Sequence, residues 1–432
     1  MGQPSTPFPG SQALDDAGTR LLPESQARRL AASFDLTALP AGFEADPYPV
    51  YHALRMFAPV HRMASGSVLV SRHADLEAIY KDTTLFSSDK TVEFAPKFGA
   101  SPLYEHHTTS LVFNDGARHT RVRRIMAGAL TPRAITDMEA PVVALVDGLL
   151  DGMTAKMADV GWVDLIEDFA AAIPIEVIGN MLAVPRDERG SLRDWSLAIL
   201  GALEPMPTTD QLIRGNAAVT GFITYLEGLV ANRRARPGDP EKDVLTRLIL
   251  GEADGAMLSE AELLQNCIFI LNAGHETTTN LIGNALVSLT QWPEQRARLV
   301  ADPGLIRTAV EEFLRFESSN QLGNRRTTAP VTLGGVALPE GAPITLLIGA
   351  ANRDPERFER PDRLDVGRSP NRHLAFASGA HQCVGMNVAR LEGRIALSRF
   401  LARFPDYRLA TAPVRGGRAR FRGFLSAPAE VG

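Results

Sequence analysis

One long helical segment constrains the fold of this chain more than any other feature of its sequence. Residues 259–292 keep a helical apolar periodicity, open on Ser-Glu-Ala-Glu, which is typical of a helix N-terminus, and close on Trp292-Pro293. A helix of this length would cross the whole molecule. We therefore expect a long central helix with the rest of the chain packed around it.

The apolar pattern of the remaining chain predicts a mainly α-helical protein with small β-sheets. A β-hairpin is expected over residues 60–71, and short strands, among them 331–336 and 344–348, between residues 325 and 348. Further helices are expected near residues 51–57, 118–130, 134–158, 170–182, 187–203, 212–235, 241–250, 293–300, 303–316 and from Cys383 to about 404.

The composition is that of a folded, enzyme-sized protein, with 45% hydrophobic and 22% charged residues among 432. No repeat period and no low-complexity linker divides the chain, so residues 41–432 are predicted to form a single domain. Residues 1–40 are polar and rich in Pro, Ser and Ala. This indicates an N-terminal arm that lies on the surface or is partly disordered.

Charge and cysteine usage exclude several classes of partner and location. The net charge is −5, and no basic stretch is interleaved with aromatic residues, so we expect no nucleic acid partner. Two cysteines, Cys267 and Cys383, cannot form a disulfide framework, which indicates a reducing compartment and hence the cytoplasm. Neither a signal peptide nor a run of about 18 apolar residues is present, so we expect no membrane anchor.

The segment from His373 to Met386 is a glycine-punctuated loop with a cysteine directly before a predicted helix. A thiolate at Cys383 would be stabilised by the amide groups and the positive pole of that helix. Gly379 and Gly385 would let the backbone approach a flat ligand closely. The arrangement suits an anionic ligand of iron. The alternative is a buried structural cysteine, which is the usual role of this residue type and the one we expect for Cys267.

The pattern Phe376-x-x-Gly379-x-His381-x-Cys383-x-Gly385 resembles the haem-binding loop of the cytochrome P450 family. The resemblance implies that Cys383 is the axial ligand of the iron in haem b (iron protoporphyrin IX). It also implies that Phe376 and Gly385 belong to the haem-binding residues and that His381 holds a haem propionate. In such proteins the thiolate donates electron density to the iron and favours O–O cleavage.

The same resemblance implies the fold and the reaction. We expect the cytochrome P450 fold, mainly α with small β-sheets, in which the long central helix lies over a buried haem. The expected activity is that of a monooxygenase, which uses two electrons to insert one atom of O2 into an organic substrate and releases water. Ala377 departs from the pattern, because bacterial relatives usually have glycine there, and this concerns only backbone detail.

A weak helical segment, residues 273–278 (Ala-Gly-His-Glu-Thr-Thr), lies in the middle of the long helix. Glycine and successive threonines are poor helix formers, so we expect a widened turn with Thr hydroxyls and a carboxylate turned inward. The segment resembles the oxygen-activation motif of the family. This implies that Ala273 and Gly274 lie over the haem and that Glu276 and Thr277 are the catalytic residues that deliver protons.

Glu312 and Arg315 lie three residues apart on one predicted helix face, where they can form an ion pair. Alone, this spacing is as typical of a surface salt bridge. Together with Arg368 in the loop before the cysteine, the pair resembles the Glu-x-x-Arg cluster of the family. The resemblance implies a buried folding core behind the haem rather than a catalytic role.

His119 and Arg123 lie one helical turn apart, so that both can clasp a carboxylate. The alternative is a solvated basic face, which we expect for the neighbouring arginines. The family pattern assigns His119 and Arg123 to the haem propionates and Arg325 to the same role.

The expected partners are a small organic substrate, O2 and separate electron donors. Fewer than 50 residues follow Cys383, so we expect no fused redox domain but a ferredoxin and a ferredoxin reductase. By resemblance they dock around the cysteine loop, near Arg390 and Arg394. The pocket is expected to draw on residues 92–112, 180–205 and 320–324, with Phe269 and Asn272, a mixed lining that indicates a mainly apolar substrate.

Three other functions agree with part of these motifs. A peroxide-driven enzyme of the same fold and a non-catalytic haem sensor are both disfavoured by the intact Glu276-Thr277 pair. A zinc site at His275 and Glu276 is disfavoured because the second histidine of a zinc protease helix is missing. We expect His275 to face solvent or to have its hydrogen bonds satisfied.

Overall fold

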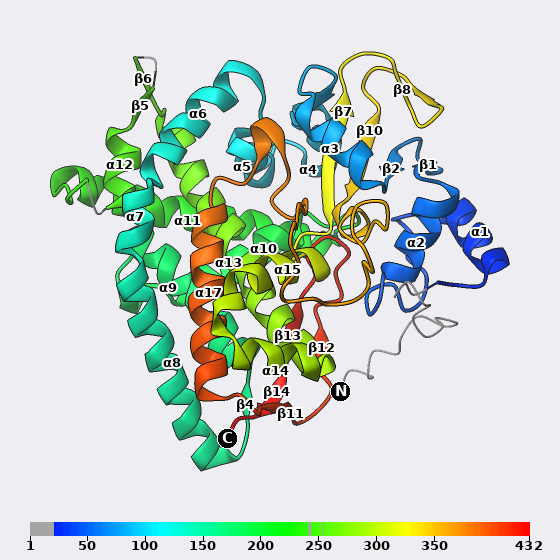
Figure 1. The fold of residues 1–432 in the computed structure, drawn as a ribbon. Helices are drawn as coiled ribbons and strands as arrows, with labels where there is room; N and C mark the ends of the chain where they lie inside the picture. Colours follow the sequence, from blue (N-terminus) through cyan, green and yellow to red (C-terminus); the bar gives the residue numbers. More distant parts are fainter. Residues whose placement is uncertain (1–20, 241–242, 254) are drawn as a thin grey trace.

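A computed structural model describes residues 21–240, 243–253 and 255–432 of the chain. Helix α13 (Glu260–Gln291) runs through the centre of the molecule, as Figure 1 shows, and most of its residues are buried. Its N-terminus is capped as the sequence predicts: Ser259 Oγ accepts a hydrogen bond from the N–H of Glu262, and the Glu262 carboxylate accepts one from the N–H of Ser259. The predicted long central helix is thus confirmed.

Other helices pack on α13 and share one apolar core with it. Helices α9 (Ala172–Met181), α10 (Gly190–Gly201) and α11 (Thr209–Ala235) contact α13, while α17 (Met386–Arg403) contacts both α13 and α8 (Glu139–Val160). The other α-helices are α1 (Glu24–Ser33), α2 (Tyr48–Phe57), α3 (His73–Lys81), α4 (Thr91–Phe98), α5 (Pro102–Thr109), α6 (Gly116–Ala129), α7 (Pro132–Asp137), α12 (Val244–Leu250), α14 (Pro293–Ala301), α15 (Ile306–Phe316) and α16 (Ile348–Ala351).

The largest sheet has five strands in the order β1-β2-β10-β7-β3. Strand β10 pairs with β2 in parallel and with β7 in antiparallel orientation, with Thr345 opposite Asn324. The five strands are β1 (Val60–Arg62), β2 (Val68–Val70), β3 (Phe86–Ser87), β7 (Leu322–Thr327) and β10 (Pro343–Leu347). The smaller sheets consist of β4 (Val163–Asp164), β11 (Arg408–Leu409) and β14 (Pro428–Glu430), of β12 (Val414–Arg415) and β13 (Phe424–Ser426), of β5 (Glu252–Ala253) and β6 (Ala256–Met257), and of β8 (Val331–Leu333) and β9 (Val336–Leu338).

Two predicted elements differ from the structure. The helix expected over residues 134–158 is two helices, α7 and α8, which meet at Met138. The single strand expected over residues 331–336 is a hairpin of β8 and β9. Its turn is formed by Gly334 and Gly335, whose φ values of 50° and 81° are readily adopted by glycine, and this reverses the chain.

The N-terminal arm expected over residues 1–40 is described only from residue 21 onward. Helix α1 packs against α2, and Ala27, Ala31 and Phe34 are buried in an apolar cluster beside that helix. The division of the chain into an arm and one domain stays a prediction. Among the described helices, none is long and apolar enough to cross a membrane.

Candidate active site

A cavity of about 360 Å³, within the range of ligand sites in proteins, lies between α13, α6, β7 and the loop before α17. Segments far apart in the sequence line it. The predicted site residues His119, Arg123, Ala273, Gly274, Thr277, Arg325, Phe376, His381, Cys383 and Gly385 all lie on its wall. Residues 106, 107, 110–113, Leu200, Leu203, Phe269, Asn272 and residues 322–325 also line it, and most of them fall in the segments from which the sequence predicts a substrate pocket.

The cysteine loop holds Cys383 at the cavity wall, directly before α17. The N–H of Cys383 donates to the carbonyl oxygen of Phe376 at 2.9 Å, which closes the loop. Burial raises the pKa of the Cys383 thiol, whereas a hydrogen bond from the N–H of Gly385 and the positive charges of Arg123 and Arg390 lower it. Burial is the largest of these contributions, so the pKa of the thiol is raised overall, and the groups that lower it oppose that effect.

Two residues of this loop have left-handed backbone conformations, with φ of 69° at Gly379 and 55° at Ala377. A Cβ at Gly379 would lie 2.6 Å from the carbonyl oxygen of Tyr80, so glycine is required there. Ala377 adopts a conformation that L-residues avoid, which gives a physical reason for the glycine expected at this position in relatives.

We expect that Ala377→Gly leaves the free energy of unfolding unchanged or raises it by up to about 1 kcal/mol. Glycine removes the strain of the left-handed conformation, which is about 1–2 kcal/mol. Part of this stabilisation is lost because glycine also gives the unfolded chain more conformational entropy. The matched control is Ala155→Gly on the exposed surface of α8, where glycine should cost about 1 kcal/mol. Urea unfolding measures both, and equal losses in the two variants would contradict the prediction.

A cluster of nitrogen donors lines another part of the cavity. His119 Nε2 and the Nε and Nη2 of Arg325 are buried and have no hydrogen-bond partner among the described residues. Arg123 forms no ion pair with any of the residues that the structure describes. Buried donors without partners are costly, so this cluster fits the carboxylates of a bound ligand. A flat ligand with two carboxylates, such as haem with its propionates, would meet that requirement, and the thiol of Cys383 lies on the same cavity wall.

His381 already has a protein partner, which sequence reasoning missed. Its Nε2 lies 2.8 Å from Asp115 Oδ1, and its ring lies 4.1 Å from that of His119 between centroids. Burial raises the pKa of the Asp115 carboxyl, but the hydrogen bonds that this carboxylate accepts lower the pKa by more, so the net value falls to about 2. Asp115 directly precedes α6, the helix that carries His119 and Arg123. This position beside the other site residues is the feature of the sequence that could have indicated a role for Asp115 in the site.

The middle of α13 faces the cavity without the widened turn expected from its sequence. The helix is continuous, and Thr277 Oγ1 donates to the carbonyl oxygen of Ala273 at 2.5 Å. Ala273 is exposed although its helix is buried, because it faces the cavity. A Cβ at Gly274 would lie 2.8 Å from Ile178 Cδ1, so this glycine also permits α9 to pack closely.

Glu276 does not lie on the cavity wall, which corrects the expectation of an inward carboxylate beside the threonine hydroxyls. Adjacent helical residues point about 100° apart, so Glu276 and Thr277 face different sides of α13. Glu276 Oε1 accepts a hydrogen bond from Arg418 Nη1 at 2.6 Å, and its buried Oε2 has no partner among the described residues. Burial raises the pKa of Glu276, and Arg418 lowers it.

Two further side chains of α13 were expected to have no catalytic role: His275 as a solvent-facing or satisfied histidine, and Cys267 as a structural cysteine. His275 is 1% exposed, and neither ring nitrogen has a hydrogen-bond partner in the described part of the chain, so the expected solvent-facing or satisfied histidine is wrong. Burial lowers its pKa to about 3, which keeps the ring neutral. Cys267 is fully buried and its pKa is raised to about 12 by burial, as expected for a structural cysteine.

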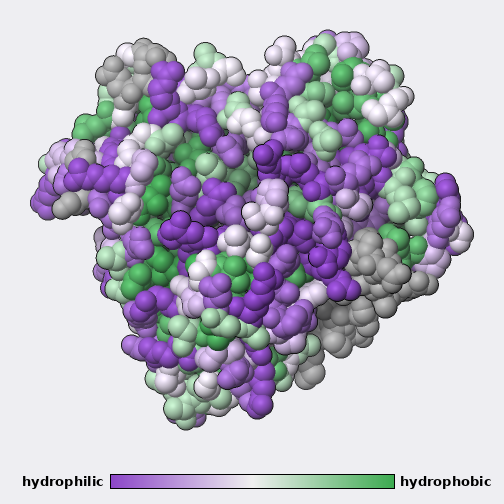
Figure 2. Space-filling view, viewed as in Figure 1, coloured by the Kyte–Doolittle hydropathy of each residue, from purple (hydrophilic) through white to green (hydrophobic). Residues whose placement is uncertain are grey.

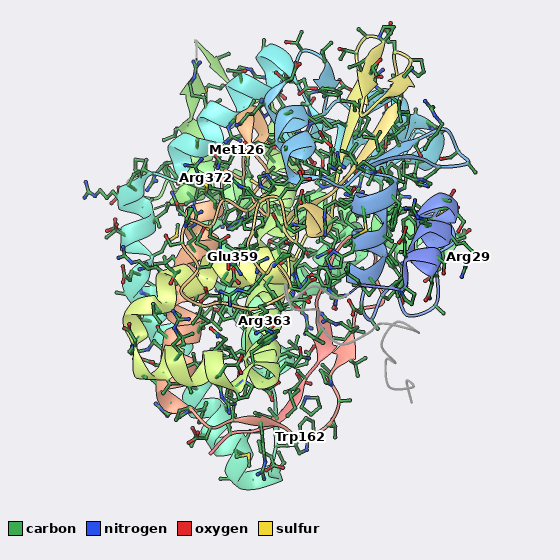
Figure 3. The ribbon with its side chains drawn as sticks, turned by 45° about the vertical axis from the view of Figure 1, so that its right-hand side comes forward. Arg29, Met126, Trp162, Glu359, Arg363 and Arg372 are labelled. Carbon is green, nitrogen blue, oxygen red and sulfur yellow. The ribbon has the colours of Figure 1, made fainter. Side chains whose placement is uncertain are left out.

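The Glu312, Arg315 and Arg368 side chains meet in the interior, as their pattern predicts. Arg315 donates two hydrogen bonds of 2.8 Å to the Glu312 carboxylate, and both side chains are 0% exposed. Arg368 Nε donates to the same carboxylate at 3.1 Å. The loop that carries Glu359 and Arg363, both labelled in Figure 3, supplies carbonyl oxygens to Arg368, which ties the segment before the cysteine loop to α15.

Comparisons with known proteins agree with this arrangement. A sequence profile described as cytochrome P450 matches residues 195–303 and 304–409. Cytochrome P450 107B1 of Saccharopolyspora erythraea is 37% identical, over 88% of this chain and 93% of that protein. Vitamin D(3) 25-hydroxylase of Pseudonocardia autotrophica is 37% identical, over 85% and 89%. The structure of P450BioI in complex with hexadec-9Z-enoic acid ligated acyl carrier protein matches with a TM-score of 0.84 and 32% identity, over 90% of this chain and 100% of that chain.

Proposed function

The chain belongs to the cytochrome P450 family of haem-thiolate monooxygenases, and from this premise we propose that it oxidises a mainly apolar small molecule with electrons from separate proteins. The observation that carries the proposal is the joint placement of Cys383 and the unpartnered donors of His119 and Arg325 on one cavity wall. The test is the absorption spectrum of the reduced carbon monoxide complex, which shows the long-wavelength band of a thiolate-ligated haem if the proposal holds.

We assign the cofactor as haem b, held by residues of this chain without a covalent bond. The two cysteines are too far apart in sequence for the Cys-x-x-Cys-His attachment of a c-type haem. Cys383 would ligate the iron, and His119, Arg123, Arg325 and His381 would bind the propionates. Phe376, Gly385, Ala273 and Gly274 would contact the ring. When bound, thiolate-ligated haem supplies the activation and cleavage of O2.

The substrate is proposed to be apolar because most of the surface of the cavity is apolar. Phe113, Leu200, Leu203 and Phe269 line it, together with polar side chains such as Asn272. Two similar proteins point to apolar molecules as well: one is named for vitamin D(3), and the other was solved with hexadec-9Z-enoic acid ligated acyl carrier protein. We propose a cytoplasmic location for the enzyme because both cysteines are free, which is typical of a reducing compartment.

Electron donors, a ferredoxin and its reductase, are proposed to dock on the face around the cysteine loop. This region and α15 lie at the front of Figure 1, and hydrophilic residues cover much of the same area in Figure 2. Arg390 is partly engaged there: it donates to Glu311 at 2.7 Å and lies over the Phe376 ring at 4.9 Å. The sequence-based docking role of Arg390 and Arg394 stays a proposal.

Thr277 and Glu276 are proposed to act on protons from two different sides of α13. The Thr277 hydroxyl donates its proton to Ala273 O, which leaves its oxygen lone pairs to accept from a proton donor in the cavity. Glu276, buried and held by Arg418, is the carboxylate from which protons would be relayed.

We expect Thr277→Ala to form less product per electron pair and to release more hydrogen peroxide, because the acceptor that positions a proton donor is lost. The matched control is Thr277→Ser, which keeps the hydroxyl and should couple as the parent does. The assay counts product, peroxide and reductant with a surrogate ferredoxin system. Unchanged product per reductant in Thr277→Ala would assign Thr277 a merely structural role.

A further inference from the structure

Arg420 occupies an unusual position in the loop between β12 and β13. Its side chain is partly buried and lines the cavity that also contains Cys383. Nε donates to Leu203 O at 3.2 Å, Nη1 to Leu322 O at 2.8 Å and Nη2 to Asn324 Oδ1 at 2.7 Å. The guanidinium is therefore fixed by groups from β7 and from the turn that follows α10, and all three acceptors are uncharged.

The positive charge of Arg420 lacks a direct counter-ion. None of the ion pairs formed within residues 21–240, 243–253 and 255–432 includes Arg420. Glu204 contributes attraction from nearby, but its Oε2 accepts from the backbone N–H groups of Ala419 and Arg420, each at 3.2 Å, rather than from the guanidinium. Arginine stays protonated even when buried, so it cannot escape this cost by losing its charge.

The positive charge of Arg420 contributes to the lowered pKa values of two neighbouring basic groups, Lys97 and His107. Burial, followed by the charge of Arg420, lowers the pKa of Lys97 to about 8. The pKa of His107, which lines the same cavity, is lowered first by burial and then by His106, Lys97 and Arg420. Glu93, the other nearby carboxylate, is already paired with Lys90 at 2.5 Å. A buried positive field of this kind favours an anionic ligand.

We propose that Arg420 anchors the carboxylate of an apolar monocarboxylic acid, so that the enzyme selects substrates with an acid group at one end. The proposal rests on the proposed monooxygenase function and specifies its substrate class. A guanidinium matches a carboxylate in shape and charge, and three of its N–H groups are occupied while the others remain for a ligand. The apolar body of the acid would lie along Leu203, Phe113 and Phe269.

The experiment measures dissociation constants of decanoate and methyl decanoate by calorimetry, with haem-loaded protein at neutral pH. The parent should bind decanoate at least about tenfold more tightly than the ester, as expected for a buried charge-assisted contact. Arg420→Gln should reduce this preference to about twofold or less. The matched control, Arg403→Gln at the exposed end of α17, should keep it.

A second variant keeps the test decisive if Arg420→Gln fails to fold. Glu204→Gln retains an oxygen for the N–H groups of Ala419 and Arg420 but removes the negative charge, so the preference for decanoate should rise at least about threefold. Equal affinity for acid and ester in the parent, or a preference unchanged in both variants, overturns the anchor. If the carbon monoxide complex of that same parent still has the thiolate band, the proposed function stands while the anchor fails. A missing band overturns the proposed function itself.

Discussion

Replacing Cys383 with histidine should give a folded protein that binds haem but forms no oxidised product. A neutral imidazole can ligate iron but lacks the electron donation of a thiolate, which the O–O cleavage step requires. The loop should persist, because its closing hydrogen bond joins the backbone of residue 383 to Phe376 O and does not use the sulfur. The measurement is the absorption maximum of the reduced carbon monoxide complex, which should lose its long-wavelength position.

The control for this experiment is the other cysteine. Cys267→Ala removes a fully buried thiol in α13 that does not line the cavity, so the long-wavelength band should remain. If unmutated protein lacks the band, or if Cys267→Ala abolishes it, the assignment of Cys383 as the iron ligand is wrong.

Arg315→Ala should leave little soluble, haem-loaded protein. The change removes both 2.8 Å hydrogen bonds to Glu312 and strands the carbonyl oxygens of Asn352 and Pro361, which Arg315 also binds. Breaking a fully buried ion pair costs about 3–5 kcal/mol. A typical folded domain is stable by only about 5–15 kcal/mol, so this loss removes a large share of its stability.

The yield of haem-loaded protein and the midpoint of urea unfolding measure the effect of Arg315→Ala. Arg298→Ala is the matched control, since Arg298 pairs with Asp365 at 2.8 Å with side chains 48% and 40% exposed. An exposed pair contributes at most about 1 kcal/mol. Normal yield and stability of Arg315→Ala would show that the buried cluster is not required for folding.

The family and much of the site could be predicted because their signals are local. The cysteine loop places Cys383, His381 and Gly379 within a few residues, and the closeness of His119 and Arg123, which we propose to bind the propionates, follows from a single helical turn. The capping of α13 is likewise written in adjacent residues. Local spacing fixes such geometry whatever the rest of the chain does.

The side of α13 on which Glu276 lies could not be predicted in the same way. A motif gives the order of Glu276 and Thr277 but not which neighbour each side chain meets. That depends on Arg418, a residue 142 positions away in a segment without a recognisable motif. The helix stays continuous at Ala273 although Thr277 Oγ1 donates to the Ala273 carbonyl oxygen, a contact that tends to bend helices, so the local sequence did not decide this turn.

The sequence by itself determined which residues have the chemistry: one thiol before a helix, one Glu-x-x-Arg pair and a long capped helix. Only the tertiary structure decided where charges end up without partners, because burial and counter-ions depend on segments brought together by folding. Asp115 was joined to His381 in this way. Folding also brought Arg420, from the loop between β12 and β13, to the wall of the cavity that contains Cys383. Its three hydrogen-bond acceptors are neutral oxygens of β7 and of the turn after α10, so its positive charge is not paired with a carboxylate there.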